Sequence, residues 1–303
     1  MRSDQPLDAV VIGAGPGGLT AALYLARFRR RFLVLDAGQS RAGWIPRTHN
    51  YPGFPGGIAG SDLLARLRRQ ARSFGATLSK GCVDSLTVTP DGFDIRAGRR
   101  RFKARTVLLA TGVIDTQPKL RGLDEAIARH MVRTCPICDG YEVRGKAIGV
   151  IGASAHGARE ALFLRTYSDD VTLIHVGEAA TLPDLERRAL AAAGLTAIET
   201  PIEAVEVQDN RIAALGADGA PVGLFDTLYL ALGSTSRNLL ARQAGAELDD
   251  QGRLKVSEHQ HTSVDGLYAA GDLVRGLNQI IVAEAEAAIA ATDIHNRLRA
   301  AGL

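Results

Sequence analysis

Residues 9–36 read AVVIGAGPGGLTAALYLARFRRRFLVLD, and this stretch decides the fold. An apolar run leads into a turn from Gly13 to Gly18, a helix follows to about Arg27, and a second apolar run ends at Asp36. A strand, a turn, a helix and a second strand form a βαβ unit, whose strands are parallel and whose crossover is right-handed. The spacing Gly-x-Gly-x-x-Gly, with an acid about 20 residues further on, is typical of dinucleotide-binding folds. The stretch therefore predicts an α/β protein with a dinucleotide site.

The parts of this turn have separate tasks in holding a dinucleotide. The first glycine allows a tight turn, the second lets the backbone approach the pyrophosphate, and the third permits close contact between helix and strand. The N-terminus of the following helix offers unpaired N–H groups to the phosphates, while Asp36 is expected to accept hydrogen bonds from ribose hydroxyls. The expected cofactor contacts of the turn are Gly13, Gly15, Pro16, Gly17 and Gly18.

The same pattern occurs a second time in the middle of the chain. Residues 147–177 read AIGVIGASAHGAREALFLRTYSDDVTLIHVG, so that Gly152 aligns with Gly13 and Gly157 with Gly18. Each copy is followed by a stretch of alternating apolar and polar residues, which predicts a small antiparallel meander. A chain of 303 residues exceeds the size of a single ordinary core. The repeat therefore predicts two domains of similar construction.

The strongest chemical signal is the motif Cys135-Pro136-Ile137-Cys138-Asp139-Gly140. Two thiols with two residues between them can close a disulfide ring. A helix N-terminus or a nearby cation lowers the pKa of one thiol and so produces the attacking thiolate. Asp139, next to the second sulfur, is placed to carry a proton. The chain has three cysteines, too few for a disulfide scaffold, so the pair is expected to be catalytic.

Two alternatives exist for these cysteines. Structural zinc requires four ligands, and no second Cys-x-x-Cys or histidine pair stands at a suitable spacing, since His259 and His261 are distant and only two positions apart. Inert thiols are the other alternative. Cys82 stands alone in a stretch expected to be a strand, where a small buried apolar residue is the expectation.

The chain resembles the thioredoxin reductases, a branch of the pyridine-nucleotide-disulfide oxidoreductases, along nearly its whole length. The motifs that carry the resemblance are the first glycine turn, the CxxCDG motif, HNYPGFP from residue 49, Ala110-Thr111-Gly112 and Ala270-Gly271-Asp272. It implies FAD at the first turn, with Asn50 and Gln279 beside the flavin and Asp272 on its ribityl chain. It also implies that Thr111 and Gly112 lie in the segment crossing between domains, and that Cys138 faces the flavin. An alternative for Asp272 is a helix cap.

The resemblance and the repeat together predict two doubly wound domains of the FAD/NAD(P)-binding type, the second inserted in the first. The FAD domain is expected to span residues 1–116 and 238–303. The inserted NAD(P)-binding-like domain, with the redox pair, is expected to span residues 117–237. The resemblance further implies a homodimer.

The second glycine turn departs from the pattern of NADPH-binding relatives. Ser154 stands where a glycine would let the backbone approach the pyrophosphate. The strand ending at His175 runs into Val176-Gly177, where the relatives place paired arginines for the 2′-phosphate. Glu178 is a candidate for the ribose of NADH. The sequence therefore predicts weak use of NAD(P)H.

Three functions follow from these motifs. The first is an FAD-dependent dithiol/disulfide oxidoreductase, whose partner is a thioredoxin-like protein or a small dithiol or disulfide, with ferredoxin or oxygen as further redox partners that the resemblance implies. The second is an NAD(P)H-dependent thioredoxin-disulfide reductase. The third, a flavin-binding sensor without turnover, is disfavoured because it has no use for an aspartate beside a dithiol.

The composition is that expected of an ordinary soluble protein. The net charge is +3 and 46% of residues are apolar. Aromatics make up 5%, and arginines are scattered over several predicted elements, which argues against nucleic acid and favours solvated faces or docking of an acidic partner. The start of the chain lacks a secretory pattern, and no apolar run is long enough to span a membrane. We therefore expect a cytoplasmic protein.

Overall fold

The computed structural model describes residues 5–152, 154–176, 182–274 and 276–303, and these ranges form two compact units. Unit 1 comprises Met1–Ile114 and Thr235–Leu303, and unit 2 comprises Asp115–Ser234. The chain passes between them twice, through β7 (Val113–Asp115) and β16 (Ser234–Ser236), which pair with each other.

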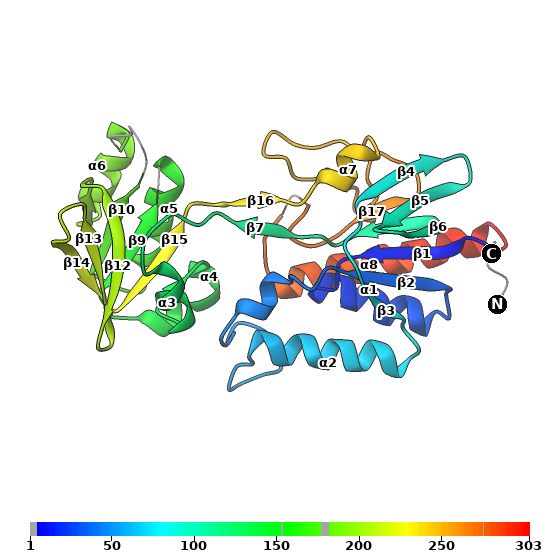
Figure 1. Cartoon of the computed structure of the whole chain (residues 1–303), viewed down its shortest axis with the longest axis horizontal. Helices are drawn as coiled ribbons and strands as arrows, with labels where there is room; N and C mark the ends of the chain where they lie inside the picture. Colours follow the sequence, from blue (N-terminus) through cyan, green and yellow to red (C-terminus); the bar gives the residue numbers. More distant parts are fainter. Residues whose placement is uncertain (1–4, 153, 177–181, 275) are drawn as a thin grey trace. The chain divides into compact units, whose positions relative to one another are not determined.

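Unit 1 is built on a seven-stranded sheet (Figure 1). The order is β3-β2-β1-β6-β5-β4, with β17 pairing on β6. Neighbours are parallel from β3 to β6 and at β17, whereas β4, β5 and β6 form the antiparallel meander expected after the first βαβ unit. The elements are β1 (Leu7–Ile12), α1 (Pro16–Arg27), β2 (Phe32–Asp36), the 3₁₀ helix η1 (Arg41–Trp44), α2 (Gly60–Ser73), β3 (Leu78–Lys80), β4 (Ser85–Thr89), β5 (Gly92–Ala97), β6 (Arg100–Leu109), α7 (Leu239–Gln243), β17 (Leu267–Ala269) and α8 (Ile280–Ala300).

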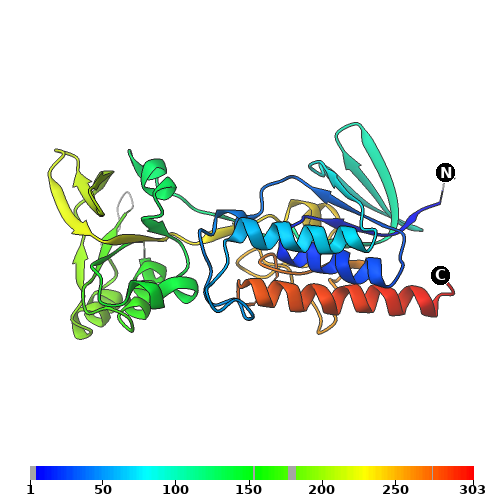
Figure 2. The same cartoon turned by 90° about the horizontal axis from the view of Figure 1, so that it is seen from below.

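The central strands of unit 1 bury both faces, because successive side chains point to opposite sides. In β1, Ala9 and Val11 pack toward the three helices, which Figure 2 shows side by side in the order α2, α1, α8. Val10 and Ile12 pack toward the meander and α7. The small buried side chains of α8, such as Ala287 and Ala291, let that helix lie close to α1.

Unit 2 repeats this construction on a parallel sheet of order β11-β10-β9-β15-β8. A separate antiparallel sheet, β12-β13-β14, corresponds to the second predicted meander. The elements are α3 (Leu123–Ala128), β8 (Val132–Arg133), α4 (Pro136–Asp139), the 3₁₀ helix η2 (Gly140–Val143), β9 (Ile148–Gly152), α5 (Ser154–Leu164), β10 (Val171–His175), α6 (Asp184–Ala192), β11 (Thr196–Ile198), β12 (Ile202–Gln208), β13 (Arg211–Gly216), β14 (Pro221–Phe225) and β15 (Thr227–Ala231).

The core of unit 2 is also divided between the two faces of its parallel sheet. Ile148 and Val150 of β9 pack with residues of α5 and α6. Ile151 packs on the other face with α3 and the β12–β14 sheet, including Ile212 and Phe225. The internal repeat in the sequence therefore corresponds to a repeated layering of the structure. No helix of the described ranges is long and apolar enough to cross a bilayer.

Candidate active site

The first glycine turn is a backbone cradle that side chains would fill. Gly13 has φ +109°, and a Cβ placed on it would lie 2.2 Å from the carbonyl oxygen of Ala110. A Cβ on Gly18 would lie 1.9 Å from the carbonyl oxygen of Gly13. Both positions therefore require glycine, and α1 begins at Pro16 directly beside them. This close approach of backbone segments at a helix N-terminus fits a bound dinucleotide pyrophosphate.

Two further glycines of the turn have different neighbours. A Cβ on Gly17 would lie 3.0 Å from the carbonyl oxygen of Ala283 in α8, so this glycine permits close packing of the two helices. Gly15 caps the N-terminus of α1, and among the described residues a Cβ there would contact only the Ser40 hydroxyl, at 3.3 Å. The backbone at Gly15 is therefore open to a ligand in a way that the backbone at Gly17 is not.

Asp36 lies at the carboxyl end of β2, next to the glycine turn. Its Oδ1 accepts a 2.8 Å hydrogen bond from the backbone N–H of Gly38, and its Oδ2 lies 3.6 Å from Arg68. Leu35 precedes Asp36 in β2, and its carbonyl accepts a hydrogen bond from the N–H of Gly13. The acid expected to hold a ribose is thus fixed at the same edge of the sheet as the turn.

Asn50 and Gln279, far apart in the sequence, are brought together. The Asn50 side-chain amide donates a 2.8 Å hydrogen bond to Oε1 of Gln279, and the hydroxyl of Thr48 donates to Oδ1 of Asn50 at 2.8 Å. These contacts orient both amides at the start of α8. The hydrogen bond therefore brings together two residues that were each expected beside the flavin.

The remaining sequence-predicted residues of unit 1 lie at the ends of β6 and β17. Thr111 donates its hydroxyl proton to the carbonyl of Arg237, whose N–H donates to the carbonyl of Gly112. The N–H of Gly271 donates to the Glu286 carboxylate at 2.7 Å, and Arg41 lies 3.3 Å from Asp272. Asp272 therefore has a cationic neighbour that the sequence did not indicate.

Sequence reasoning also missed a tyrosine beside Asn50 that is hydrogen-bonded to a buried carboxylate. The hydroxyl of Tyr51 donates a 2.7 Å hydrogen bond to Oε2 of Glu284 in α8. Glu284 is 8% exposed, and its Oε1 is buried without a hydrogen-bond partner among the described residues. Burial raises the pKa of Glu284 and, together with the nearby carboxylate, the pKa of Tyr51. The available signal was a glutamate, one of two, in an alanine-rich helix.

In unit 2, Cys135 and Cys138 form a disulfide, with their Cα atoms 5.3 Å apart. The N–H of Cys138 donates to the carbonyl of Cys135, closing a single helical turn in which Pro136 is buried and Ile137 exposed. Gly140, which follows Asp139, faces the ring of Tyr167, and a Cβ there would lie 2.6 Å from it. The motif CxxCDG is thus a disulfide ring followed by a glycine that packing requires.

Asp139 is held by two residues that sequence reasoning did not select. Its Oδ2 accepts a 2.7 Å hydrogen bond from the guanidinium of Arg133, and its Oδ1 accepts one of 2.7 Å from the hydroxyl of Tyr229. Tyr229 is fully buried, and burial together with the Asp139 carboxylate raises the pKa of its phenol. No spacing rule links Arg133 to Tyr229, because β8 and β15 meet only in the folded sheet.

The expectation for Cys82 is wrong. It lies in the loop between β3 and β4, is exposed, and is not bonded to another cysteine. The alternating pattern that suggested a strand begins only at Ser85. The loop therefore leaves the thiol open to solvent.

The second glycine turn keeps the close packing of the first. A Cβ on Gly157 would lie 2.8 Å from Cα of Gly152, so both glycines bring α5 against β9. Ser154 begins α5, and β10 ends at the buried His175. Glu178, the candidate for an NADH ribose, lies outside the described residues. This turn therefore preserves the contact between helix and strand, but it has a serine where the first turn has its second glycine.

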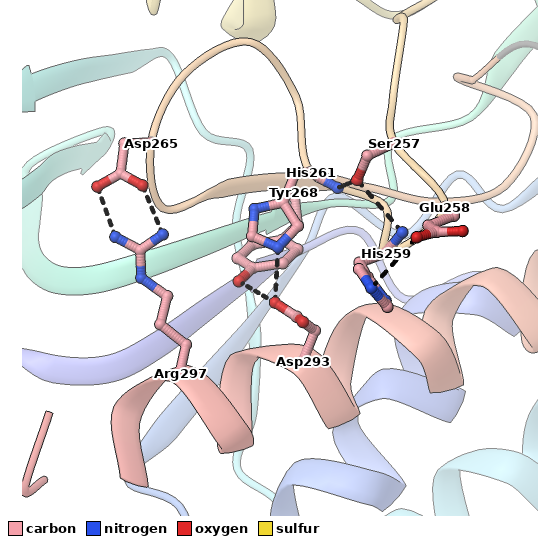
Figure 3. Close-up of polar contacts among 8 residues, drawn as sticks. All are labelled: Ser257, Glu258, His259, His261, Asp265, Tyr268, Asp293 and Arg297. Carbon is pink, nitrogen blue, oxygen red and sulfur yellow. Dashed lines mark hydrogen bonds and ion pairs between the residues drawn. The ribbon is translucent and has the colours of Figure 1, made fainter. Parts of the chain in front are cut away.

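Figure 3 shows a polar cluster of unit 1 that the sequence did not predict. Nε2 of His261 lies 2.6 Å from Oδ2 of Asp293, and the hydroxyl of the buried Tyr268 donates to the same oxygen at 2.8 Å. Further along α8, Arg297 pairs with the exposed Asp265. These contacts fasten the segment around β17 to α8. Within the described ranges, no three His, Cys, Asp or Glu side chains are grouped so as to hold a metal.

Comparison with known proteins identifies the family. The family model described as "Pyridine nucleotide-disulphide oxidoreductase" matches residues 7–287. The chain belongs to this family. It is 34% identical over 277 residues to a thioredoxin reductase of Mycolicibacterium smegmatis, covering 88% of each chain. It is 30% identical over 294 residues to that of Aquifex aeolicus, covering 94% of this chain and 91% of the relative. The solved thioredoxin reductase of Streptococcus pyogenes superposes with a TM-score of 0.89 at 24% identity, over 98% of this chain and all of that one, which shows the shared fold.

Family membership agrees with the geometry and confirms several sequence-based predictions. The α/β fold with parallel sheets is confirmed. The chain is an enzyme, an FAD-dependent disulfide oxidoreductase of the thioredoxin reductase type, and the adjacent Cys135 and Cys138 fit a redox-active disulfide. The backbone cradle at Gly13 and Gly18 is consistent with the FAD that this family uses.

Proposed function

We propose that the Cys135–Cys138 pair exchanges two electrons with a thioredoxin-like protein or a small dithiol or disulfide. The observation that carries the proposal is the disulfide closed within a single helical turn and followed by the anchored carboxylate of Asp139. A disulfide ring of this kind opens by thiolate attack through a mixed disulfide, and the reaction requires a site for the displaced proton.

The residues of unit 1 are proposed to hold FAD. When bound, FAD supplies two-electron redox chemistry. The glycine turn receives the pyrophosphate, Asp36 the adenosine ribose, and the Asn50–Gln279 pair the flavin end. The full set proposed to contact the cofactor is Gly13, Gly15, Pro16, Gly17, Gly18, Asp36, Asn50, Thr111, Gly112, Gly271, Asp272 and Gln279. Unit 1 is thus the FAD domain and unit 2 the inserted domain that carries the dithiol.

Within the pair, Cys135 is proposed to exchange with the partner and Cys138 to face the flavin. Asp139 accepts the proton that leaves a thiol and returns it in the opposite direction. Both cysteines are partly exposed, so that a partner sulfur can approach. The proposed assembly is a cytoplasmic homodimer, with ferredoxin as a further candidate electron donor.

A second candidate function is an NAD(P)H-dependent thioredoxin reductase. The description of the family, which names a pyridine nucleotide, favours it, and the preserved Gly152–Gly157 contact keeps the required βαβ packing. Ser154 at the phosphate position and the absence of arginines after His175 argue for a weaker nucleotide site. We therefore rank dithiol/disulfide exchange first and NAD(P)H dependence second.

An anaerobic exchange experiment tests the proposed function. The holoprotein is reduced with dithiothreitol, freed of excess reductant and mixed with oxidised thioredoxin or with glutathione disulfide. Return of the flavin absorbance together with formation of partner thiols is the expected result for at least one of the two. A flavin that stays reduced with both disulfides, or recovers without partner thiols forming, would contradict the proposal.

A further inference from the structure

The carboxylate of Asp139 is bonded on both oxygens to residues of the parallel sheet in unit 2. Arg133 donates to Oδ2 and Tyr229 donates to Oδ1, each at 2.7 Å. Arg133 belongs to β8 and Tyr229 to β15, and the two residues are partners in the parallel register of these strands. Paired residues of neighbouring strands point to the same face of a sheet, so the two donors form one platform beneath Asp139.

This platform leaves the carboxylate able to react. The two oxygens of an ionised carboxylate offer about four acceptor positions, so each oxygen of Asp139 keeps one position beyond the bond it already makes. The guanidinium of Arg133 balances the negative charge, and charge-assisted bonds of this kind hold geometry strongly. Asp139 is therefore fixed in place while it retains acceptor capacity toward a thiol proton.

The burial of Tyr229 requires its hydroxyl to keep the hydrogen bond to Asp139. The ring is 0% exposed, packed in the core with Ile148 and Val150, so the hydroxyl has no access to bulk water. A buried hydroxyl without a partner is costly, so the hydroxyl stays on Oδ1. Glu142 is the other carboxylate near Tyr229, and its Oε2 is buried without a hydrogen-bond partner among the described residues. Both carboxylates favour the neutral, proton-donating form of the phenol.

We propose that Arg133 and Tyr229 are positioning residues that hold the Asp139 carboxylate in place to accept and return the thiol proton of the Cys135–Cys138 pair. The inference rests on the proposed function, in which Asp139 serves the dithiol. It assigns a catalytic consequence to two residues of the sheet that lie outside the CxxCDG motif.

The step in which Asp139 acts can be written in full. In the reduced pair, one cysteine is a thiolate and the other a thiol. The thiolate of Cys135 attacks a partner disulfide, forming a mixed disulfide and releasing one partner thiolate. The thiol of Cys138 then gives its proton to Asp139, and its sulfur attacks Cys135, which expels the second partner thiolate and restores the ring. The dithiol loses two electrons, the partner gains them, and the proton passes from Asp139 to solvent.

Single-turnover exchange with a chromogenic disulfide tests the inference. The holoprotein carries Cys82→Ser, because the exposed thiol of Cys82 would react with the same reagent. It is reduced with dithiothreitol, desalted anaerobically and mixed with one equivalent of 5,5′-dithiobis(2-nitrobenzoate), so that the reduced flavin cannot drive a second turnover, and the released thiolate is followed in two phases. Tyr229→Phe and Arg133→Met should each slow the second phase about tenfold, the effect of losing one hydrogen bond to a charged group. Arg133→Lys, which keeps the charge, should recover part of the rate.

A double-mutant cycle separates positioning from a merely structural role. In an Asp139→Asn background, Tyr229→Phe and Arg133→Met should cause little further slowing, since the carboxylate through which they act is gone. Tyr268→Phe, which removes another buried tyrosine–carboxylate bond in unit 1, should lower thermal stability and leave both phases unchanged. Arg211→Met, which breaks an ion pair with Asp226 in unit 2, is a second control.

The outcomes distinguish this inference from the proposed function. If the protein with Cys82→Ser does not react with the reagent in two phases, the proposed function and the inference both fail. If Asp139→Asn slows the second phase while Tyr229→Phe and Arg133→Met do not, only the inference fails. Equal slowing by Tyr229→Phe in the presence and absence of the carboxylate would also overturn it.

Discussion

The hydroxyl of Tyr229 donates a 2.7 Å hydrogen bond to Oδ1 of Asp139, the residue directly after the second cysteine of the redox pair. The tyrosine is in β15 and the aspartate ends α4, 90 positions earlier in the chain. Because the tyrosine is fully buried, the bond connects the redox turn to the core of unit 2. The position of the Asp139 carboxylate is thus fixed by a residue of β15, a strand that is distant in the sequence.

The purified protein is expected to be yellow and to release FAD, not FMN, on denaturation. The turn from Gly13 to Gly18 and the acid at Asp36 are arranged for a dinucleotide with an adenosine ribose, which FMN lacks. Chromatography of the released flavin checks this. Absence of bound flavin after incubation with FAD would remove the basis of the proposed function.

Cys135→Ser and Cys138→Ser should each retain FAD and lose complete dithiol/disulfide exchange, because ring closure requires both sulfurs. Flavin content is measured by absorbance and exchange by release of thiols from oxidised thioredoxin or glutathione disulfide. The exposed Cys82 provides a matched control, and Cys82→Ser should exchange at the normal rate. Normal exchange by either active-site variant would place the redox group elsewhere.

Dithiothreitol should reduce the flavin faster than millimolar NADPH in anaerobic stopped-flow. Ser154 and the missing arginines weaken two sets of phosphate contacts, and each lost charge-assisted bond forfeits about 1.5–3 kcal/mol, so affinity falls about a hundredfold or more. Ser154→Gly should improve reduction by NADPH and leave reduction by dithiothreitol unchanged. Rapid bleaching that saturates with micromolar NADPH would favour the NAD(P)H-dependent candidate instead.

Asp293→Ala should destabilise the holoprotein by about 1–3 kcal/mol, because it removes the carboxylate to which the hydroxyl of the fully buried Tyr268 donates. Denaturant unfolding measures the change. Asp265→Ala is the matched control from the same cluster, since its side chain is 82% exposed and surface ion pairs contribute about 0–1 kcal/mol. Equal losses from the two variants would show that the His261–Asp293–Tyr268 contacts do not stabilise unit 1 in this way.

Glu284→Gln should change how stability depends on pH. Burial raises the pKa of Glu284 above its ordinary value of 4.5 in the folded state. Above that value the unfolded chain releases a proton that the folded chain retains, so the free energy of unfolding falls as the pH rises. The loss is complete once the pH passes the raised pKa.

Glutamine cannot ionise and keeps an oxygen for the Tyr51 hydroxyl, so the variant should gain stability relative to the natural protein over the range in which the pH rises from 4.5 to the raised pKa of Glu284. Guanidinium unfolding of the holoprotein across this range provides the measurement. Glu258→Gln, at an exposed glutamate, should show no such gain. A stability difference that is independent of pH would contradict a buried, proton-retaining Glu284.

Short-range patterns in the chain predicted much of the fold. The helix expected to end near Arg27 is α1, the strand expected to end at Asp36 is β2, and both meanders form as antiparallel sheets. These elements were predictable because strand alternation, helix periodicity and glycine turns are local properties. Cys82 was misjudged because the strand begins only at Ser85, so that residues 81–84 form a loop.

By itself the sequence determined the two βαβ repeats, the glycine cradle and the Cys135–Cys138 pair, since each depends on residues that are close together in the chain. Only the tertiary structure decided which side chains surround them. Arg133 and Tyr229 meet Asp139 because β8 and β15 pair in parallel register, and Asn50 meets Gln279 because the loop after η1 returns to α8. Such pairings depend on which strands and helices pack together, and the burial that makes them strong exists only once both faces of each sheet are covered.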